Sequence, residues 1–560
     1  MQELVSKCKT MNSIKRRDNC VFLAFFLLSI VLLLFRCFYG LGVEFSDEFS
    51  QPAVIKRFLF GDRLLIDDWQ PATTLIGYVL YSIVNVFGGM NFNILHLRFA
   101  YVVFQISTAV LFLCVLDRNR IESKISALAY LFSTPYGIMS ICYNTVAISS
   151  FLLFVAFMVS DYKSWKRVCA GVCLSVSVLS IPHIAFIFVL YLVVTIFNAV
   201  FKFEDFFFKI SDIKWMMLGI SVLLIPFCVI VLTRGSLQEY YTNLKFILGD
   251  SEHTEYSIWF KVFRSQYQIL RVYWRVWIPL TILCLVGIYL RKSIRAKMII
   301  YVLTCLSVVY GTVRFAFVYG SVSINLMIVP VFFWGISSTV LARFWGVDLS
   351  MLHKEIVWLI VGYIFAVCDY LATNTEILSM SAMFIIASIG AVFINAKVYS
   401  LLNFSSKYFF FVAGIFVVCL AVLRMTYIWG DSFSLKYYEK IESGVAKGIY
   451  TSSINAQEYY EKQEIIARAE LSDEDSVLIV PINPLYYISS KGAVASPYVF
   501  RFKTDLNELI EYYDSHLYKM PTKVIVFDTY TYFDIIDYFC DNGYTFTEKG
   551  SDYSILSICE

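Results

Sequence analysis

The chain has 560 residues, of which 59% are apolar and only 16% are charged. A soluble domain carries roughly 25% charged residues, so most of this chain is expected to face lipid. The formal net charge of +3 excludes the strongly basic surface that binds nucleic acid, and no nucleic acid is expected as a partner. The 14 cysteines are scattered singly, which is typical of buried free thiols rather than of a disulfide framework or a zinc site.

The N-terminus combines a basic segment with an apolar run at 20–39. The run is long, and Arg36-Cys37-Phe38 offers no small-residue cleavage site, so it predicts an uncleaved first span. Further apolar runs bring the prediction to about 13 spans. These runs lie at 98–116, 125–142, 145–160, 168–181, 184–201, 215–233, 276–290, 298–313, 322–342, 356–373, 379–396 and 408–428.

One further apolar run, at 72–90, is decided by the distribution of Lys and Arg. If it is left out, the basic residues of the N-terminus and of the connections all fall on one side of the membrane. The positive-inside rule makes that side cytoplasmic. We therefore expect a cytoplasmic N-terminus, and an interfacial helix or re-entrant element at 72–90.

The tail changes character at Trp429-Gly430-Asp431, where charged and turn residues return. Strand patterns alternate there with helical patterns, which predicts a small α/β domain with a parallel sheet. The strand patterns are at 477–480, 523–527 and 554–557, and the helical ones at 505–518 and 532–542. The predicted fold is an α-helical polytopic membrane bundle over 1–429, with outer loops at 40–97 and 234–275, and an extracytoplasmic α/β domain over 430–560.

The first outer loop opens with the acidic pair Asp47-Glu48, directly after a span. An amphipathic stretch containing Arg57 follows, and then Asp68. A carboxylate fixed between a span end and an interfacial helix has a lowered local dielectric, which gives a general base a pKa near its working pH. Asp47 and Glu48 are therefore candidate catalytic residues, and the alternative is that they are only solvated surface charges. Arg57 and Asp68 are candidate substrate-binding residues.

The order of these features resembles the polytopic GT-C glycosyltransferases, which include the protein O-mannosyltransferases and the lipid A aminoarabinose transferases. The features are the first span, Asp47-Glu48, Gly61-Asp62, the segment around Pro71, and Arg98 at the opening of the second span. The resemblance implies transfer of a sugar from a polyprenyl-phosphate donor, with inversion at the anomeric carbon. It implies that Asp47 takes the acceptor proton, and that Glu48 orients Asp47 or binds a divalent metal ion.

The chain departs from the family pattern at four places. Gln70-Pro71-Ala72 stands where the family has Pro-Pro-Leu, and Arg98-Phe99-Ala100 where it has Arg-Leu-Pro. Asn144 stands where the family often has an Asp, and His183 follows Pro182 where many members have a Lys. Asn144 can position a hydroxyl but cannot accept a proton, so Asn144 and His183 are candidate substrate-binding residues only.

Arginines in the second outer loop are candidates for binding the donor phosphate. Arg264, Arg271 and Arg275 are interleaved with aromatic residues, and a bidentate guanidinium suits phosphate. The alternative is an interfacial aromatic belt with snorkelling arginines. Arg314 and Asn325 border an outer turn where the family contacts its substrate.

Two further expectations concern charges outside these loops. His253 could bind a divalent metal ion together with Glu48, although two residues do not make a coordination set. Arg36 and Arg424 lie near the outer ends of spans and are expected to snorkel toward water.

These features predict a multi-pass glycosyltransferase of a bacterial cell membrane, acting on a glycan, lipid or protein acceptor. One alternative is a transporter or lipid-linked saccharide flippase with an extracytoplasmic binding domain. The sequence has no inverted repeat and no paired broken helices that would favour it. Another alternative is an envelope scaffold, in which Asp47 and Glu48 would be replaceable.

Overall fold

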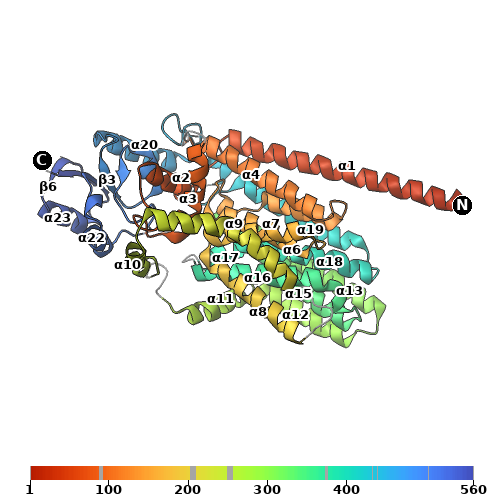
Figure 1. Cartoon of the computed structure of the whole chain (residues 1–560). Helices are drawn as coiled ribbons and strands as arrows, with labels where there is room; N and C mark the ends of the chain where they lie inside the picture. Colours follow the sequence, from red (N-terminus) through yellow and green to blue (C-terminus); the bar gives the residue numbers. More distant parts are fainter. Residues whose placement is uncertain are drawn as a thin grey trace.

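The computed structural model describes residues 2–86, 93–201, 210–248, 256–372, 376–431, 433–437, 439–501 and 503–558. Long helices lie alongside one another in a bundle, and a small unit with a β-sheet, formed by the tail from residue 430, caps one end (Figure 1). The helices up to residue 248 are α1 (Gln2–Phe38), α2 (Asp47–Leu59), α3 (Pro71–Val86), α4 (Ile94–Val115), α5 (Ile121–Phe132), α6 (Tyr143–Val159), α7 (Ser164–Ser180), α8 (Ala185–Phe201), α9 (Ile210–Arg234) and α10 (Leu237–Leu248). The later helices of the bundle are α11 (Ile258–Val272), α12 (Trp274–Tyr289), α13 (Ile294–Val318), α14 (Ser323–Leu326), α15 (Val329–Phe344), α16 (His353–Ala372), α17 (Ile377–Met383), α18 (Ile385–Leu401) and α19 (Ser406–Thr426).

Seven helical segments of the described chain are long and apolar enough to cross a membrane, and nine if two bent pairs each count as one span. The bent pairs are α11 with α12, at 82°, and α17 with α18, at 45°. The other predicted spans correspond to α5, α6, α7 and α8, which have only 12, 17, 17 and 17 residues. The protein is therefore a multi-pass membrane protein, and the described residues support seven to nine spans rather than about 13.

The described part of the predicted segment, residues 72–86, lies in the short helix α3, which is not among the helices long enough to span; residues 87–90 lie outside the described residues. It packs on α2, and a Cβ added to Gly77 would lie 2.3 Å from the Val54 side chain. Leu75, Tyr78 and Tyr81 pack against the core that α2 shares with the tail. This placement agrees with the prediction that the segment does not cross the membrane.

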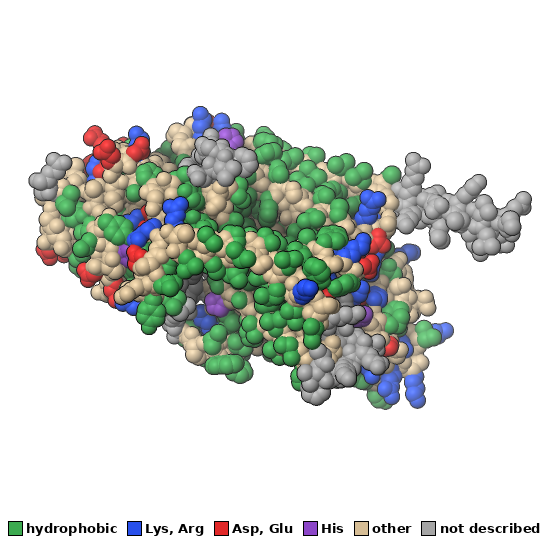
Figure 2. Space-filling model, in the orientation of Figure 1, with side chains coloured by type: hydrophobic (Ala, Val, Ile, Leu, Met, Phe, Trp, Pro, Cys, Tyr) green, Lys and Arg blue, Asp and Glu red, His purple; other side chains and the backbone are tan. Residues whose placement is uncertain are grey.

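Lys and Arg side chains gather at the end of the bundle away from the tail, beyond a largely apolar middle (Figure 2). We call this the basic end. The connections α4–α5, α6–α7, α12–α13 and α15–α16 lie there. The opposite end carries α2 and the tail, and we call it the Asp47 end. The positive-inside rule predicts that the basic end faces the cytoplasm.

The predicted span at 125–142 is wrong in its second half. Helix α5 ends at Phe132, and residues 133–142 form a buried irregular segment that contains only a short turn at Pro135–Gly137. Gly137 has φ +76°, and a Cβ there would lie 2.6 Å from the Tyr427 carbonyl oxygen. Proline near the helix end and glycine at a close backbone approach explain why the helix stops.

The tail folds around a five-stranded sheet in the order β4-β3-β5-β7-β6. Strands β3 (Ser476–Val480) and β5 (Lys523–Phe527) are parallel and buried, as predicted, but β7 pairs antiparallel with both β5 and β6. The sheet is therefore mixed and not parallel, because β6 (Tyr544–Lys549) and β7 (Tyr553–Ile558) follow each other in a hairpin without a crossover helix. The other elements are β1 (Glu439–Lys440), β2 (Tyr450–Thr451), β4 (Ala493–Val494), α20 (Ser453–Arg468), α21 (Pro484–Ser489), α22 (Leu506–Ser515) and α23 (Phe533–Asp541).

The first loop and the tail share one hydrophobic core. Trp69 is fully buried, stacks on Phe246 of α10 at 4.0 Å between ring centroids, and donates its backbone N–H to the Pro497 carbonyl. From α2, Lys56 donates from Nζ to the carbonyl oxygens of Tyr487 and Ser490, both at 2.6 Å. The tail therefore fixes where α2 lies.

The orientation of the bundle can be tested with single cysteines in a background without native cysteines. Ile294 at the basic end is 78% exposed and Leu517 of the tail is 75% exposed. We expect Leu517→Cys to react with a membrane-impermeant maleimide in intact cells, and Ile294→Cys to react only after permeabilisation. Labelling of Ile294→Cys alone in intact cells would reverse the assignment of the two ends.

Candidate active site

The N-terminus of α2 carries three carboxylates with different environments. Glu44 accepts the backbone N–H of Glu48 at 2.9 Å and that of Ser46 at 2.9 Å, so it caps the helix. Burial and the neighbouring charge of Asp47 together raise the pKa of Glu44 to about 8. Glu44 is not among the residues predicted from sequence, because it lies two positions before the N-cap Ser46, outside the usual capping positions.

Glu48 is buried, and both of its carboxylate oxygens have partners. Its Oε2 forms an ion pair with Arg98 Nη2 at 2.7 Å, and its Oε1 accepts the Met139 backbone N–H at 3.0 Å. Arg98 in turn donates to the Gly42 carbonyl at 2.6 Å. Glu48 therefore joins α2 to α4 and to the irregular segment 133–142, and its oxygens are not free to accept a substrate proton.

Asp47, the adjacent residue, is half-buried, and its carboxylate has no hydrogen bond or ion pair with any residue that the structure describes. Burial, and to a smaller extent the charge of Glu48, raise the pKa of Asp47 to about 6. A carboxylate with a pKa of about 6 is mostly ionised at neutral pH, and its pKa lies close to that pH, which suits a general base.

The irregular segment 133–142 lies against the first turn of α2, where Met139 and Ser140 both donate to Glu48. Its carbonyl oxygens accept from two buried arginines: Gly137 from Arg36 Nη2 at 3.1 Å, and Ile138 from Arg424 Nη1 at 2.9 Å. The prediction that Arg36 and Arg424 snorkel toward water is therefore wrong, because both side chains satisfy backbone that has no helical partners. Asn325 accepts the Tyr136 N–H at 2.9 Å and donates to the Leu378 carbonyl at 3.0 Å, so it also holds this segment.

The first turn of α6 carries Tyr143 and Asn144. Burial raises the pKa of the Tyr143 phenol, and the charges of Asp47 and Asp369 raise it as well, so each of these carboxylates lies near Tyr143. Asp369, on the last turn of α16, is buried and accepts a hydrogen bond from Ser379 Oγ at 2.7 Å. Asn144 is buried, and its Oδ1 has no hydrogen-bond partner among the described residues. The Asp47 end therefore holds a second carboxylate and an amide that a hydroxyl group could meet.

Arg57 and Asp68 lie on the other side of α2, toward the tail. Arg57 is fully buried, with Nε 2.7 Å from Asp62 and Nη1 3.4 Å from Asp68. Lys519 of the tail also pairs with Asp62. Burial opposes the charge of Arg57, but Asp68 and Asp62 raise its pKa above the ordinary value. These charges compensate one another and join the loop to the tail, so the geometry gives Arg57 and Asp68 a structural role.

The arginines of the second loop are dispersed. Arg264 on α11 forms an ion pair with Glu376 and lies over the Tyr256 ring at 5.0 Å. Arg271 and Arg275 are exposed, and Arg275 lies over the Trp274 ring at 5.0 Å. This arrangement matches the interfacial-belt alternative more closely than a convergent phosphate site.

Arg314 and His183 complete the predicted set. Arg314 is half-buried near the end of α13, and it has no hydrogen bond or ion pair with any described residue. Its helix contacts α14, whose Asn325 reaches the irregular segment. His183 is exposed in the short turn Pro182–Ile184 before α8.

A divalent metal ion is not supported by the described residues, which contain no group of three or more His, Cys, Asp or Glu side chains placed to hold one. Glu48, its predicted ligand, is already bound by Arg98 and two backbone N–H groups. His253 lies outside the described residues. The metal therefore stays a prediction, and no step of the chemistry is derived from it.

The structural role of Glu48 can be tested by stability. Glu48→Gln leaves Arg98 buried without a counter-charge, which typically costs about 3–5 kcal/mol. The exposed pair Arg468–Glu464 at 2.6 Å serves as the control, because Glu464→Gln should cost at most about 1 kcal/mol. Thermal unfolding of the purified protein in detergent measures both, and equal effects would contradict the structural role of Glu48.

No protein-family model and no curated protein matches this sequence. Among solved structures, the chain is similar to the oligosaccharyltransferase of Archaeoglobus fulgidus in its apo form, with 11% identity over 91% of this chain and 70% of that one, and a TM-score of 0.44. It is also similar to the archaeal oligosaccharyltransferase AglB from the same organism in complex with an inhibitory peptide and a dolichol-phosphate, with 12% identity over the same shares and a TM-score of 0.42. At these TM-scores the similarity assigns neither a fold nor an activity to this chain.

Proposed function

We propose that this protein is a membrane glycosyltransferase that moves a sugar from a polyprenyl-phosphate donor to an acceptor hydroxyl at the Asp47 end. The observation that carries the proposal is the contrast between the two carboxylates of the acidic pair. Glu48 is held by an ion pair and backbone N–H groups, whereas Asp47 is half-buried, unpaired within the described residues, and has a pKa raised to about 6.

The proposed step is a single displacement. The acceptor oxygen attacks the anomeric carbon while Asp47 takes the hydroxyl proton, and the new C–O bond forms as the bond to the phosphate oxygen breaks. The lipid phosphate leaves with the electron pair, and the configuration at the anomeric carbon inverts. Glu48 is a positioning residue in this scheme, because it fixes the first turn of α2 from which Asp47 projects.

The leaving phosphate needs a cation that is not already neutralised. Arg57 is fully buried and paired with two aspartates, and Arg264 is paired with Glu376. Arg271 and Arg275 are exposed at the surface, where water screens their charge. Arg314 is half-buried and unpaired within the described residues, and its helix contacts α14 at the Asp47 end. We therefore assign the phosphate to Arg314 rather than to Arg57 or the second-loop arginines.

The acceptor would enter beside the tail. The segment after α1 pairs with the tail, since Gly42 N–H donates to the Tyr450 carbonyl and Tyr450 N–H donates to the Gly40 carbonyl, both at 2.8 Å. Asp47 follows this pairing by five residues, so the tail is close enough to recognise an acceptor while it fixes the base.

The general-base role predicts that Asp47→Asn folds and inserts but loses transfer by about 10²–10⁴-fold, because an amide cannot accept the proton. Transfer from a radiolabelled polyprenyl-phosphate sugar measures the loss, with thermal unfolding as the check on folding. Asp541→Asn, at an exposed position of the tail, is the matched control and should keep wild-type transfer. Full activity of Asp47→Asn would overturn the assignment.

The raised pKa of Asp47 predicts the pH dependence of catalysis. The base works only when ionised, so kcat/KM should be constant above about pH 6 and fall tenfold per unit as the pH drops below it. An unperturbed aspartate would place this fall at about pH 4. A midpoint at that lower value would show that the titrating base is not the half-buried Asp47.

The phosphate role predicts that Arg314→Lys lowers transfer although the charge is kept, because a point charge replaces a bidentate fork. Arg295→Lys, at an exposed position on the same helix at the basic end, is the control and should have no effect. If both variants transfer equally well, the phosphate binds elsewhere.

A further inference from the structure

We propose that the basic end holds a binding site for a membrane phospholipid with an amine headgroup, with the headgroup in a charged pocket and one acyl chain in an adjoining apolar cavity. This site lies at the opposite end of the bundle from Asp47 and is separate from the proposed donor site.

The charged pocket, of about 160 Å³, lies where α4, α6, α16 and α18 meet. Three cations and three carboxylates line it together with the rings of Trp358 and Phe393. The charged residues are Arg120, Lys166, Lys354, Asp117, Asp161 and Glu355. Basic pockets between membrane helices on the cytoplasmic side are typical binding places for phospholipid headgroups.

The balance of charge selects the kind of headgroup. Two of these charges are neutralised from outside the lining: Lys397 pairs with Glu355 at 3.2 Å, and Glu122 pairs with Arg120 at 2.6 Å. Burial lowers the pKa of Lys166, Asp161 raises it, and the neighbouring cations Lys163, Arg167 and Lys354 lower it. A phosphate beside Lys166 and Lys354 would relieve the crowding of cations, and a primary ammonium beside Asp117 and Asp161 would balance the remaining carboxylates. A zwitterion that carries both groups fits this lining better than an anion.

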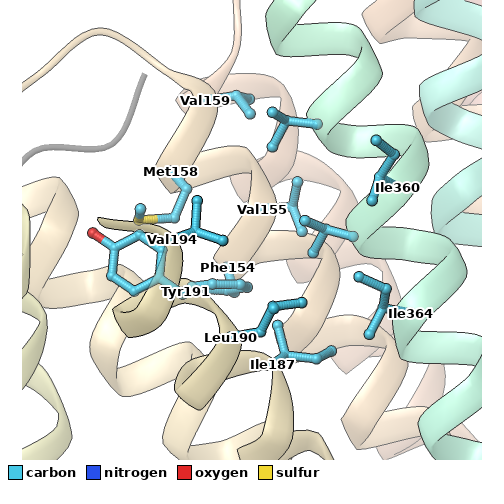
Figure 3. Close-up of a pocket in the computed structure, with 12 residues that line it drawn as sticks. Phe154, Val155, Met158, Val159, Ile187, Leu190, Tyr191, Val194, Ile360 and Ile364 are labelled. Atoms are coloured by element: carbon cyan, nitrogen blue, oxygen red, sulfur yellow. The ribbon is translucent and has the colours of Figure 1, made fainter. Parts of the chain in front are cut away.

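The apolar cavity, of about 180 Å³, lies between α6, α8 and α16. Side chains of α6 and α8 face Ile360 and Ile364 of α16 across it (Figure 3). Its lining is aliphatic and aromatic apart from the Tyr191 hydroxyl. Such a lining takes a hydrocarbon chain and offers nothing to a sugar.

The two spaces are neighbours on the same helices. Val159, at the end of α6, lines both, and on α16 Val357 lines the apolar cavity while the next residue, Trp358, lines the charged pocket. A molecule that fills both spaces must have a charged head and an apolar chain, which is the chemistry of a phospholipid.

The position of the site separates it from the donor. Along α6, Tyr143 near Asp47 and Val159 at the pocket are 16 residues apart, or about 24 Å. Along α16, Glu355 at the pocket and Asp369 near Tyr143 are 14 residues apart, or about 21 Å. Both helices therefore place the charged pocket near the opposite face of a hydrocarbon layer about 30 Å thick. A donor phosphate at the Asp47 end cannot reach it.

The test is lipid binding to the purified full-length protein, measured by native mass spectrometry after delipidation and addition of single lipids. We expect phosphatidylethanolamine to bind with a stoichiometry of one, and phosphatidylcholine, whose ammonium has no N–H to donate, to bind at least tenfold more weakly. Equal binding of phosphatidylcholine or tighter binding of phosphatidylglycerol would overturn the proposal. So would displacement of phosphatidylethanolamine by a polyprenyl phosphate, because the cavity would then belong to the donor.

Two variants and one control place the lipid. Lys166→Met should weaken phosphatidylethanolamine binding about tenfold by removing a phosphate ligand, and Ile360→Trp should weaken it by filling the cavity. Ile360 is 50% exposed, so the larger side chain leaves the packing of α16 intact. Lys292→Met, at an exposed position of the basic end outside the pocket, should bind like wild type. Loss of binding in Lys292→Met equal to that in Lys166→Met would show charge attraction without a built site. Because binding is the readout, these results do not depend on sugar transfer.

Discussion

The arrangement of the Asp47 end depends on one constraint, which is that the irregular backbone of residues 133–142 is buried and needs partners for its polar groups. A helix would supply them internally, but α5 has ended at Phe132. Side chains from distant parts of the chain supply them instead. Arg36 and Arg424 donate to its carbonyl oxygens, and Glu48 accepts one of its N–H groups. Unpaired backbone in such a place costs several kcal/mol per group, so the fold itself requires these contacts, whatever the chemistry at the site.

This constraint also explains how two adjacent carboxylates come to differ. Glu48 is drawn into the network with Arg98 and Met139, and it fixes the first turn of α2. Asp47 then projects from a rigid position without a partner of its own among the described residues. The tail supports α2 from the other side, because Lys56 of α2 donates to two carbonyl oxygens of the tail. The base is thus held between the bundle and the tail, which is the condition for a fixed position and a raised pKa.

Hydropathy and charge bias predicted which segments are apolar helices, the end at which basic residues gather, and the exclusion of 72–90 from the spans. They could not predict that 133–142 leaves the helix, although Pro135 and Gly137 were visible signals, because a hydropathy window averages over them. The burial of Arg36 and Arg424 is not predicted for a related reason. A transfer scale gives the free-energy cost of burying a guanidinium, but it does not include the distant carbonyl oxygens that offset this cost. The prediction of a parallel sheet is wrong because it takes no account of the hairpin turn at Gly550 between β6 and β7. The acidic pair was recognised from sequence, but only the contacts of Arg98 distinguish Glu48 from Asp47.

The central claim is that Asp47, and not Glu48, is the proton acceptor, and chemical rescue tests it most directly. Asp47→Gly removes the base and leaves space for a small carboxylate, so added formate should restore sugar transfer in this variant in a concentration-dependent way. Formate should not restore transfer in Glu48→Gly, because the ion pair with Arg98 and the position of α2 are lost there. Rescue of Glu48→Gly with no rescue of Asp47→Gly would contradict the account.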